Sequence, residues 1–343
     1  MDILYSSSDS YAFLTGISIL SLLKNNKAAE HINIYIMDNH ITDENKNKLR
    51  DVVEKYGREI QFVPMPDMKV KTGLEIDTRR WNISTFGRLY MAGVLPETVH
   101  KVLNIDCDTI IVDSIEELWE TDLTGKVVGG MLECINDRYR HNVGMKDGEY
   151  YLNGGVIFLN LDEVRKCDYE RKFTEYIVKY GDSLAYLDQD VINGPVPQDK
   201  KVKLSIRYNM LSPYFYVNYE QMLTMRRSKS FYTKEAYEAG VKNPGLIHFT
   251  TCYLDGLRPW IEGNKHPFLS EFLRYKEMSP WKDVPLQEDT RKKKSKLFSW
   301  MVKHMPRMMV LESASFMHGV VVPIKNAKNM NHAKRKMVGK DLK

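Results

Sequence analysis

The first 66 residues of the chain alternate short apolar runs with longer segments whose apolar side chains recur at helical spacing. Strands are predicted for the three apolar runs, at residues 2–6, 32–37 and 60–63. Helices are predicted between them, over Ala12–Leu23 and from Thr42 onward. Because a helical crossover returns the chain to the same end of a sheet, this alternation predicts an α/β fold with a mainly parallel sheet flanked by helices.

The remaining sequence continues the pattern with less regularity. Further strands are expected at Lys101–Ile105, Val127–Met131, Val156–Asn160 and Leu246–Phe249. Helices are expected over Ser84–Gly93 and from Asp162 to about Tyr180. Residues 205–245 are rich in Tyr, Met and Lys and give a weak, mixed signal. The folded body is expected to end near residue 285, ahead of a charged run.

Charge is distributed unevenly along the chain. Residues 291–343 hold 14 Lys or Arg against two acids, whereas the preceding residues hold 36 basic and 43 acidic side chains. An acidic body with a basic tail predicts a tail that seeks anionic surfaces and argues against a nucleic-acid-binding protein. Apolar residues also follow the lysines of RKKKSKLFSW, a mixture typical of a helix lying in a membrane interface. The alternative is a disordered, solubilising tail, and Pro306 would interrupt any long helix.

Cysteine usage and hydropathy indicate the compartment. The four cysteines are scattered without a C-x-x-C pair, which argues against a zinc ribbon or a disulfide scaffold and fits a reducing cytoplasm. The N-terminal sequence does not predict a signal peptide. The longest apolar stretches are too short, or too interrupted by polar residues, to span a bilayer. We therefore expect a cytoplasmic protein held at the inner face of the membrane by its tail.

The strongest chemical signal is VLNIDCDTIIV, residues 102–112. Asp106 and Asp108 follow an apolar strand with one residue between them, so both leave the sheet at its carboxyl edge, where open α/β sheets bind ligands. Paired carboxylates at this position suit a hard divalent ion that contacts substrate phosphates. The alternative is an ordinary polar strand end that caps the next turn.

A second group of polar residues follows the first predicted strand. Small hydroxyls and Tyr11 could hold a nucleoside there, with Tyr11 stacked on the base. Asp9 or Ser10 could instead cap the helix that begins at Ala12. Arg88 falls in a helix expected near the same edge of the sheet, although taken alone it is typical of a solvated helical arginine.

Three further signals lie later in the chain. Asn153-Gly154-Gly155 precedes a strand, where adjacent glycines permit close approach of a ligand but also simply make turns. Asp188-Gln189-Asp190 opens a short helix, whose N-terminus its acids would stabilise without any other role. His248 ends a strand and precedes a polar loop, and a single histidine is more often structural than a ligand.

These pieces occur in one order, and in that arrangement the chain resembles the family 8 retaining glycosyltransferases, which have a GT-A fold. The likeness is to bacterial lipooligosaccharide and lipopolysaccharide galactosyltransferases and glucosyltransferases. It is carried by six motifs: MDILYSSSDSYAF, STFGRLYMAGVLP, KVLNIDCDTIIVDSIEELWETDL, GMKDGEYYLNGGVIFLNL, YLDQDVIN and HFTTCYLDGLRPW. The resemblance implies a catalytic domain over residues 1–285, with the donor and metal site mainly in 1–160 and the acceptor side in 150–260. A basic, partly amphipathic tail would follow over residues 286–343.

The resemblance also implies roles for single residues. Asp106, Asp108 and His248 correspond to the ligands of a Mn²⁺ ion, with Mg²⁺ as the alternative. Gln189 corresponds to the residue under the anomeric carbon and Asp190 to the acid beside it on the acceptor side, so these two are the predicted catalytic residues. The donor-binding residues are expected to be Ser7, Asp9, Tyr11, Arg88, Asp106, Cys107, Asp108, Asn153, Gly154, Asp188, Gln189, His248, Gly256 and Arg258.

The chain departs from the family pattern in three places. Ser8 stands where relatives often carry an acid near the base. The loop between His248 and Arg258 is longer than usual, and arginine replaces the lysine that holds the diphosphate, although arginine can still bind phosphate through two N–H groups. Glu133 takes the place of a sugar-binding aspartate.

The expected function is transfer of a hexose from UDP-galactose or UDP-glucose to a saccharide or lipid-linked acceptor of a cell-surface glycan, such as lipopolysaccharide or capsule. The resemblance implies retention of the α configuration. Because Gln189 is a poor nucleophile, front-face substitution is favoured over a covalent intermediate. One alternative is a nucleotidyltransferase, which usually has a glycine-rich basic loop where this chain has SSSDSY. The other is an inactive carbohydrate-binding protein, against which the intact pair of aspartates and the histidine argue.

Overall fold

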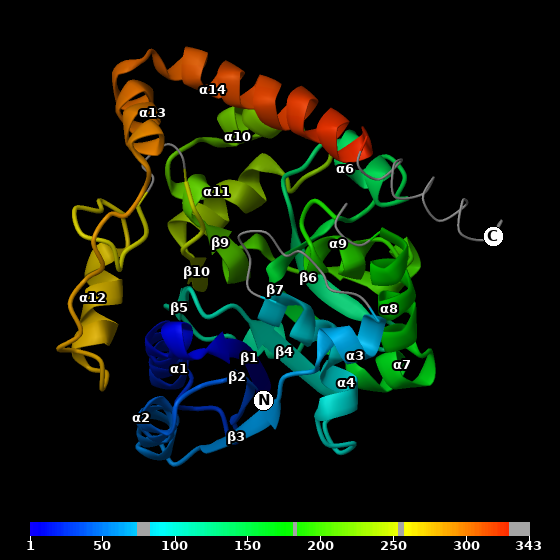
Figure 1. The fold of residues 1–343 in the computed structure, drawn as a ribbon, viewed down its shortest axis with the longest axis vertical. Helices are drawn as coiled ribbons and strands as arrows, with labels where there is room; N and C mark the ends of the chain where they lie inside the picture. Colours follow the sequence, from blue (N-terminus) through cyan, green and yellow to red (C-terminus); the bar gives the residue numbers. More distant parts are fainter. Residues whose placement is uncertain (74–82, 181–183, 253–256, 329–343) are drawn as a thin grey trace.

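The first half of the fold is the predicted alternation of strands and helices. The structure is a computed structural model that describes residues 1–73, 83–180, 184–252 and 257–328 (Figure 1). Its first elements are β1 (Asp2–Ser8), α1 (Ala12–Asn25), β2 (Asn33–Asn39), α2 (Asp43–Glu54) and β3 (Glu59–Pro64). Both β1 with β2 and β2 with β3 pair in parallel. The Thr42 hydroxyl caps α2 by accepting from the Asn45 backbone N–H, so the predicted helix start is confirmed.

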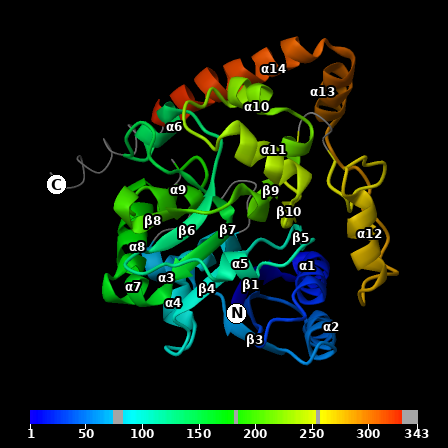
Figure 2. The same cartoon turned by 180° about the vertical axis from the view of Figure 1, so that it is seen from behind.

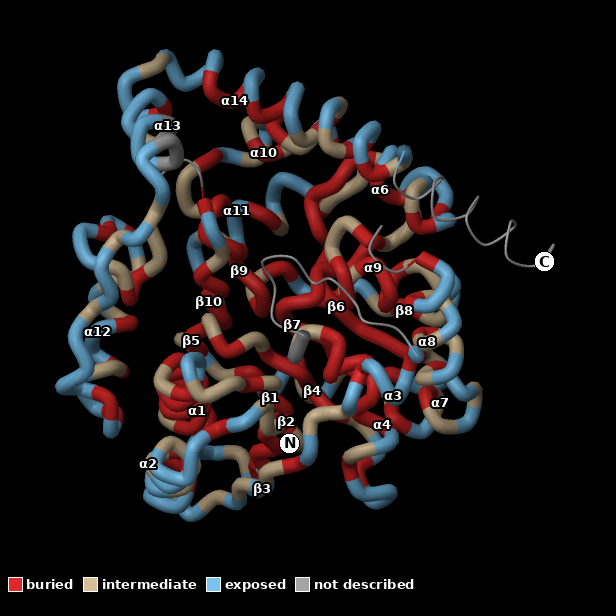
Figure 3. Tube along the Cα trace, in the orientation of Figure 1, coloured by how far each residue is buried: buried red, intermediate tan, exposed pale blue. Residues whose placement is uncertain are grey.

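The main sheet has seven strands in the order β3-β2-β1-β4-β7-β6-β8. The added strands are β4 (Lys101–Ile105), β6 (Val128–Leu132), β7 (Leu152–Asn160) and β8 (Lys201–Lys203). Strand β7 runs antiparallel to both β4 and β6, so the sheet is mixed and mainly parallel, as predicted. In the burial view β1, β4, β6 and β7 form the buried centre of the molecule (Figure 3).

Helices group on the two sides of this sheet. Helices α1 and α2 lie together at one side (Figures 1 and 2). At the other side lie α3 (Met68–Thr72), α4 (Met91–Val94), α7 (Leu161–Lys166) and α8 (Tyr169–Tyr180). The predicted fold class, a helix-flanked mainly parallel sheet, is therefore confirmed.

A small second sheet lies beside the carboxyl end of β4. It contains β5 (Thr109–Ile111), β10 (Leu246–His248) and β9 (Met210–Leu211), in the order β5-β10-β9. Strand β10 pairs antiparallel with β5, and His248 lies opposite Thr109. Only Asp106, Cys107 and Asp108 separate the end of β4 from the start of β5. The predicted D-x-D segment is therefore the link between the two sheets.

Three sequence predictions of element boundaries are wrong. The helix predicted from Asp162 to Tyr180 is two helices, because Asp168 adopts a left-handed conformation with φ of 51° that ends α7. Ser84–Gly93 is mostly a 3-10 helix over Ile83–Tyr90, in which a Cβ atom at Gly87 would lie within 2.5 Å of the sulfur atoms of Met37 and Met65. Asn153–Gly155 lie inside β7 instead of before it.

The weakly predicted region 205–245 forms several short elements around the second sheet. They include two 3-10 helices, Ile206–Asn209 and Ser212–Phe215, and the α-helices α10 (Tyr219–Arg226) and α11 (Lys234–Lys242). Three more short helices are α5 (Glu116–Trp119) after β5, α6 (Asp137–Asn142) after β6 and α9 (Asp188–Asn193) after α8.

The C-terminal segment packs back onto the body. It comprises α12 (Leu269–Glu277), α13 (Lys293–His304), α14 (Arg307–Phe316) and a π-helical turn over Met317–Val321. Helix α13 ends just before Pro306 and α14 begins just after it, as expected for a helix-breaking proline. Helix α14 runs along α10 in both views (Figures 1 and 2). Within the described ranges, no helix is long and apolar enough to cross a membrane.

Trp281 attaches the segment after α12 to α1. Its buried indole ring lies directly on Gly16, and its Nε1–H donates to Asn45 Oδ1 of α2 at 3.0 Å. A Cβ atom at Gly16 would overlap this ring. The contact therefore requires a glycine in the middle of α1, where glycine is otherwise unfavourable for a helix.

We expect Gly16→Ala to destabilise the protein by about 1–3 kcal/mol, measured by urea unfolding, because the new methyl group overpacks a filled site. The sign is diagnostic, since glycine to alanine in a helix otherwise stabilises by about 0.5–1 kcal/mol. In a Trp281→Ala background the same change should become neutral or stabilising. Equal destabilisation in both backgrounds would contradict the role given to this contact.

Candidate active site

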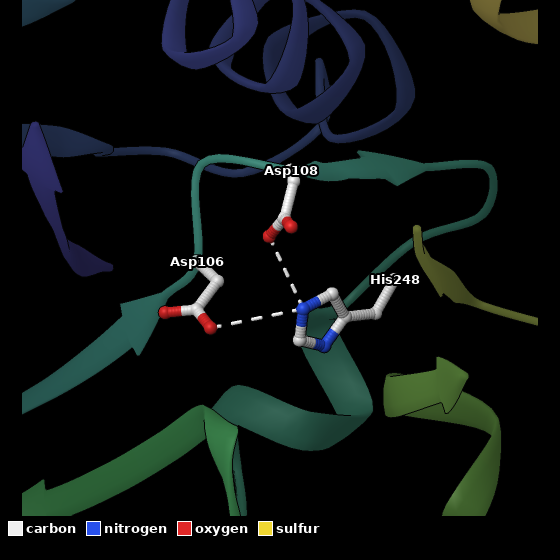
Figure 4. Close-up of side chains that lie close together, drawn as sticks. All are labelled: Asp106, Asp108 and His248. Atoms are coloured by element: carbon white, nitrogen blue, oxygen red, sulfur yellow. Dashed lines mark ion pairs between the residues drawn. The ribbon is translucent and has the colours of Figure 1, made fainter. Parts of the chain in front are cut away.

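Strand pairing brings two aspartates and a histidine together (Figure 4). Asp106 follows β4, Asp108 precedes β5, and His248 is the last residue of β10, which pairs with β5. The backbone N–H of Phe249 donates to the Asp108 carbonyl oxygen at 2.9 Å, which extends this pairing by one residue. Residues more than 130 positions apart in the sequence are thus fixed side by side by a backbone register.

The three side chains point at one another. His248 Nε2 lies 3.1 Å from Asp108 Oδ1 and 3.7 Å from Asp106 Oδ2. Burial alone would lower the pKa of His248, but the charges of Asp108 and Asp106 raise it overall. Burial acts to raise the pKa of Asp108, yet His248 and Arg258 lower it to about 2. The site therefore holds a strong concentration of negative charge that is matched by the neighbouring cations.

The donor atoms of these residues fit a divalent ion. One ligand atom from each of Asp106, Asp108 and His248 lies within 4.8 Å of the others. Carboxylate oxygens with one imidazole suit Mn²⁺, and Mg²⁺ also accepts carboxylate ligands. Among the described residues this is the single group of three or more His, Cys, Asp or Glu side chains with such spacing.

Arg88 contacts Asp106, strand β7 and helix α9. Its guanidinium donates to Asp106 Oδ1 at 2.5 Å and to the Gly154 carbonyl oxygen, and its Nε lies 3.2 Å from Asp188 Oδ2. Burial raises the pKa of Asp188, with Arg88 opposing the shift. Arg88 is buried, so the interpretation of a solvated helical arginine is wrong.

The glycines of β7 leave room for the side chains of the site. Gly155 lies opposite the aspartates, since its carbonyl oxygen accepts from the Asp106 backbone N–H at 2.8 Å. A Cβ atom at Gly155 would overlap the His248 ring, so this position admits no side chain without displacing the histidine. Gly154 differs, because a Cβ there would meet only Asp188 and Gln189 at 3.4 Å, an ordinary contact distance.

The predicted catalytic residues lie at the start of α9. Leu187, just before the helix, has a φ of 48°, an uncommon conformation for a residue other than glycine. Gln189 Oε1 accepts from the Gly154 N–H at 2.8 Å. Asp190 is buried and accepts from the Tyr151 hydroxyl at 2.5 Å and the Tyr186 N–H at 2.8 Å. Burial raises the pKa of Asp190.

Residues predicted to bind the nucleoside are more loosely grouped. Tyr11 is 39% exposed and lies beside Arg258, whose charge opposes the burial that raises the pKa of Tyr11. The carboxylate of Asp9 is held by Thr42 and Asn45 instead of facing the aspartate cluster. The capping alternative for Asp9 or Ser10 is not seen, because Tyr11 is the N-cap of α1 and no side chain caps it.

Two predicted donor-binding side chains are already engaged within the protein. The Ser7 hydroxyl is buried against Thr15 Oγ1 at 2.8 Å, and Cys107 Sγ donates to the Ser6 carbonyl oxygen at 3.2 Å.

Arg258 Nη1 lies 3.4 Å from Asp108 Oδ2, on the side of the aspartates that Tyr11 occupies. Gly256 lies outside the described residues.

The sequence interpretation missed Asn209. This buried amide is the last residue of the 3-10 helix Ile206–Asn209 and contacts both His248 and Asn153. It falls in the region with the weakest sequence signal. The available clue was a polar residue placed between Tyr208 and the apolar pair Met210–Leu211, a pattern typical of a buried side chain with a hydrogen-bonding role.

The sheet is mixed and mainly parallel, and it carries two aspartates and a histidine at its carboxyl edge. A buried arginine and a glycine-containing strand lie beside them. This is the arrangement of GT-A glycosyltransferases. The model of glycosyl transferase family 8 matches residues 2–262, and the chain belongs to that family. The family predicted from the sequence is therefore confirmed, and the protein is an enzyme of the glycosyltransferase class.

Known relatives cover most of the chain. General stress protein A of Bacillus subtilis is 24% identical over 287 residues, which cover 83% of this chain and 96% of the relative. Lipopolysaccharide 1,2-glucosyltransferase of Escherichia coli is 23% identical over 289 residues, covering 82% of this chain and 79% of that enzyme. The structure of galactosyltransferase LgtC in complex with donor and acceptor sugar analogs shares the fold, with a TM-score of 0.68 and 22% identity over 87% of this chain and 100% of LgtC.

We expect Gly155→Ala to displace the His248 ring and to lower Mn²⁺ affinity, because the new methyl group cannot coexist with the imidazole in its present place. The measurement is titration of the protein with Mn²⁺, followed by the electron paramagnetic resonance signal of the free ion. Gly154→Ala is the matched control, and its Mn²⁺ affinity should stay close to that of the wild type. Equal affinities for both variants would contradict the steric argument.

Proposed function

We propose that this enzyme transfers galactose or glucose from its UDP-sugar to a saccharide acceptor of a cell-surface glycan, in a Mn²⁺-dependent reaction. The observation that carries the proposal is the convergence of Asp106, Asp108 and His248 at the carboxyl edge of the sheet. The buried Arg88–Asp188 pair beside them supports it, since it supplies polar groups next to this cluster. The nucleotidyltransferase alternative finds no support in the family match.

Different side chains are proposed to bind the diphosphate, the sugar and the base of the donor. Asp106, Asp108 and His248 would hold a divalent ion, which supplies Lewis-acid stabilisation to the donor diphosphate. Arg258 adds a second cation beside Asp108 that can bind phosphate oxygens. Arg88, Asn153, Asp188 and Gln189 would hold the sugar, and the partly exposed ring of Tyr11 would stack on the base.

Neither of the two predicted catalytic side chains, Gln189 and Asp190, is a free nucleophile in the proposed arrangement. Gln189 is an amide, and its oxygen is bonded to the Gly154 N–H. Asp190 is 2% exposed and both of its oxygens accept hydrogen bonds. Front-face substitution follows: the bond from the anomeric carbon to UDP breaks while the acceptor oxygen bonds to the same face, and the acceptor proton passes to the departing phosphate oxygen. This accounts for retention without a covalent intermediate.

The proposed donor sugar is galactose or glucose. The named relatives include a glucosyltransferase and, among structures that share the fold, a galactosyltransferase. Sequence identities of 23% and 22% to these proteins give no preference between them. Donor hydrolysis with UDP-galactose and UDP-glucose side by side is therefore the direct way to choose.

We expect Asp108→Asn to reduce donor hydrolysis by more than the roughly 10–100-fold that loss of an outer-shell partner of a metal ligand costs. Hydrolysis by the wild type should be lost in EDTA and restored by Mn²⁺. Asp113→Asn is the matched control, because Asp113 is exposed and pairs with Arg207 away from the cluster. Full hydrolysis in EDTA would contradict the metal role, and a wild type that hydrolyses no UDP-sugar would favour the inactive carbohydrate-binding protein.

We also propose that the C-terminal helices hold the enzyme on an anionic membrane surface at the cytoplasmic face, where a lipid-linked acceptor is displayed. Apolar side chains on α13 and α14 are exposed beside exposed lysines. The exposed apolar residues of α13 are Leu297, Trp300 and Met301, and those of α14 are Met308, Met309 and Phe316. Among the described side chains, the exposed lysines on or next to α13 are Lys292, Lys293, Lys296 and Lys303. The side chain of Phe298 lies outside the described residues.

The remaining face of α14 is fixed to the body. Val310, Leu311 and Ala314 are buried, and Ser315 Oγ accepts from Arg227 Nε at 2.8 Å at the end of α10. Helix α10 belongs to the segment expected to form the acceptor side. The outward face of α14 is exposed along its length (Figure 3). Each lysine near an anionic surface contributes roughly 1 kcal/mol to attachment, so the proposed binding is reversible and sensitive to salt.

We expect Leu297→Glu to weaken sedimentation with vesicles of phosphatidylglycerol and phosphatidylcholine by about tenfold or more. Burial of a leucine side chain is worth about 1.5–3 kcal/mol, and each tenfold in affinity corresponds to about 1.4 kcal/mol. Leu273→Glu on α12 is the matched control, because Leu273 is also an exposed helical leucine. Equal weakening by both variants, or binding that high salt does not reduce, would contradict the proposed surface.

A further inference from the structure

A chain of buried polar side chains leads from β6 to the candidate metal site. Glu133 follows β6, Asn153 lies in β7, Asn209 precedes β9 and His248 ends β10. All four side chains are buried. Consecutive members are joined by hydrogen bonds of 2.5 Å, 2.8 Å and 3.0 Å, in that order. We call this set the relay.

The orientation of the first amide is set by its neighbours. Asn153 Oδ1 accepts from the backbone N–H of Gly155 at 2.8 Å, and a backbone N–H can only donate. Asn153 Nδ2 donates to Glu133 Oε2, and a carboxylate can only accept. Reversing this amide would place two donors face to face at one end and two acceptors at the other. Asn153 is therefore held in one orientation from both ends.

Asn153 in turn determines the orientation of Asn209. Because Asn153 presents its oxygen, Asn209 must donate through Nδ2, which leaves Asn209 Oδ1 facing His248 Nδ1. An oxygen in that position requires a proton on Nδ1. A reversed amide would instead favour an unprotonated Nδ1 and a proton on Nε2. That proton would occupy the nitrogen that faces Asp106 and Asp108.

We propose that Asn209 is a positioning residue that keeps the proton of His248 on Nδ1, so that the lone pair of Nε2 is available to a divalent ion. Histidine ligands generally donate their second ring N–H to such an outer partner, which fixes the ring and its tautomer. Two groups at the start of the relay cannot exchange donor and acceptor: the Gly155 N–H and the Glu133 carboxylate. Through Asn153 and Asn209 they determine which ring nitrogen of His248 carries the proton.

The relay also connects the metal site to the sugar site of the proposed function, on which this inference rests. Asn153 is one of the residues expected to hold the hexose, and both acceptor positions of its Oδ1 are used by Gly155 and Asn209. It can therefore offer a sugar only an N–H of its amide. A hydroxyl of the donor sugar would therefore have to accept a hydrogen bond from Asn153. This sugar contact and the metal ligand His248 would then belong to one network of hydrogen bonds.

The test is the affinity of the full-length protein for Mn²⁺ alone, by calorimetry and by the resonance signal of the free ion. Asn209→Leu removes the acceptor for Nδ1–H and should weaken Mn²⁺ binding about 10–100-fold. Asn209→Asp loses the donor to Asn153 Oδ1 but keeps an acceptor for Nδ1–H, so it should retain affinity within a few-fold of wild type. Asn26→Leu is the matched control, because Asn26 is a buried amide that bonds Leu22, Ser114 and Ile115, away from the site.

The result expected is a loss confined to Asn209→Leu, at thermal stabilities similar to those of the other two variants. Mn²⁺ affinity that is unchanged in Asn209→Leu, or lowered equally in Asn26→Leu and Asn209→Asp, would overturn the role of the relay while leaving the metal site intact. A wild-type protein that does not bind Mn²⁺ would instead overturn the metal role in the proposed function, and the relay with it.

Discussion

The backbone pairing of β10 with β5 is the constraint on which the candidate site depends. It places His248 opposite Thr109, one residue after Asp108, while the pairing of β4 with β7 places Gly155 beside Asp106. Both registers meet at the three-residue link between the sheets. A slip of one residue in either pairing would turn these side chains to the opposite face of a strand, so the convergence of the three ligand candidates is built into the hydrogen bonds of the backbone.

Local sequence patterns predicted much of this architecture. The alternation of the first 66 residues and the D-x-D link could be read directly, because periodicity and strand-end carboxylates are local properties. Burial of Arg88 could not, since its partners Asp106 and Asp188 are supplied by distant segments. The break at Asp168 depends on one left-handed residue. Asn209 lies among short elements that have no periodicity, and its importance appears only when β9 is placed beside β10.

The C-terminal segment shows a different limit of sequence patterns. Its basic and apolar composition was evident, but the composition does not tell which apolar residues face the protein. In the structure Val310 and Leu311 are buried while Met308 and Met309 on the same helix are exposed. The hydrogen bond from Arg227 to Ser315 fixes this division at the end of α10. The exposed side chains therefore have a definite orientation relative to the catalytic body, which an unstructured tail would lack.

The contact between Gly155 and His248 has a consequence for how such a site can change during evolution. The histidine occupies the space that any side chain at Gly155 would need, so the two positions are not independent. A lineage that keeps the imidazole must keep the glycine. Once the histidine is lost, the glycine is released from selection and can drift to alanine or serine, which would then block the histidine from returning. Loss of the histidine followed by such a substitution would therefore be hard to reverse by single substitutions.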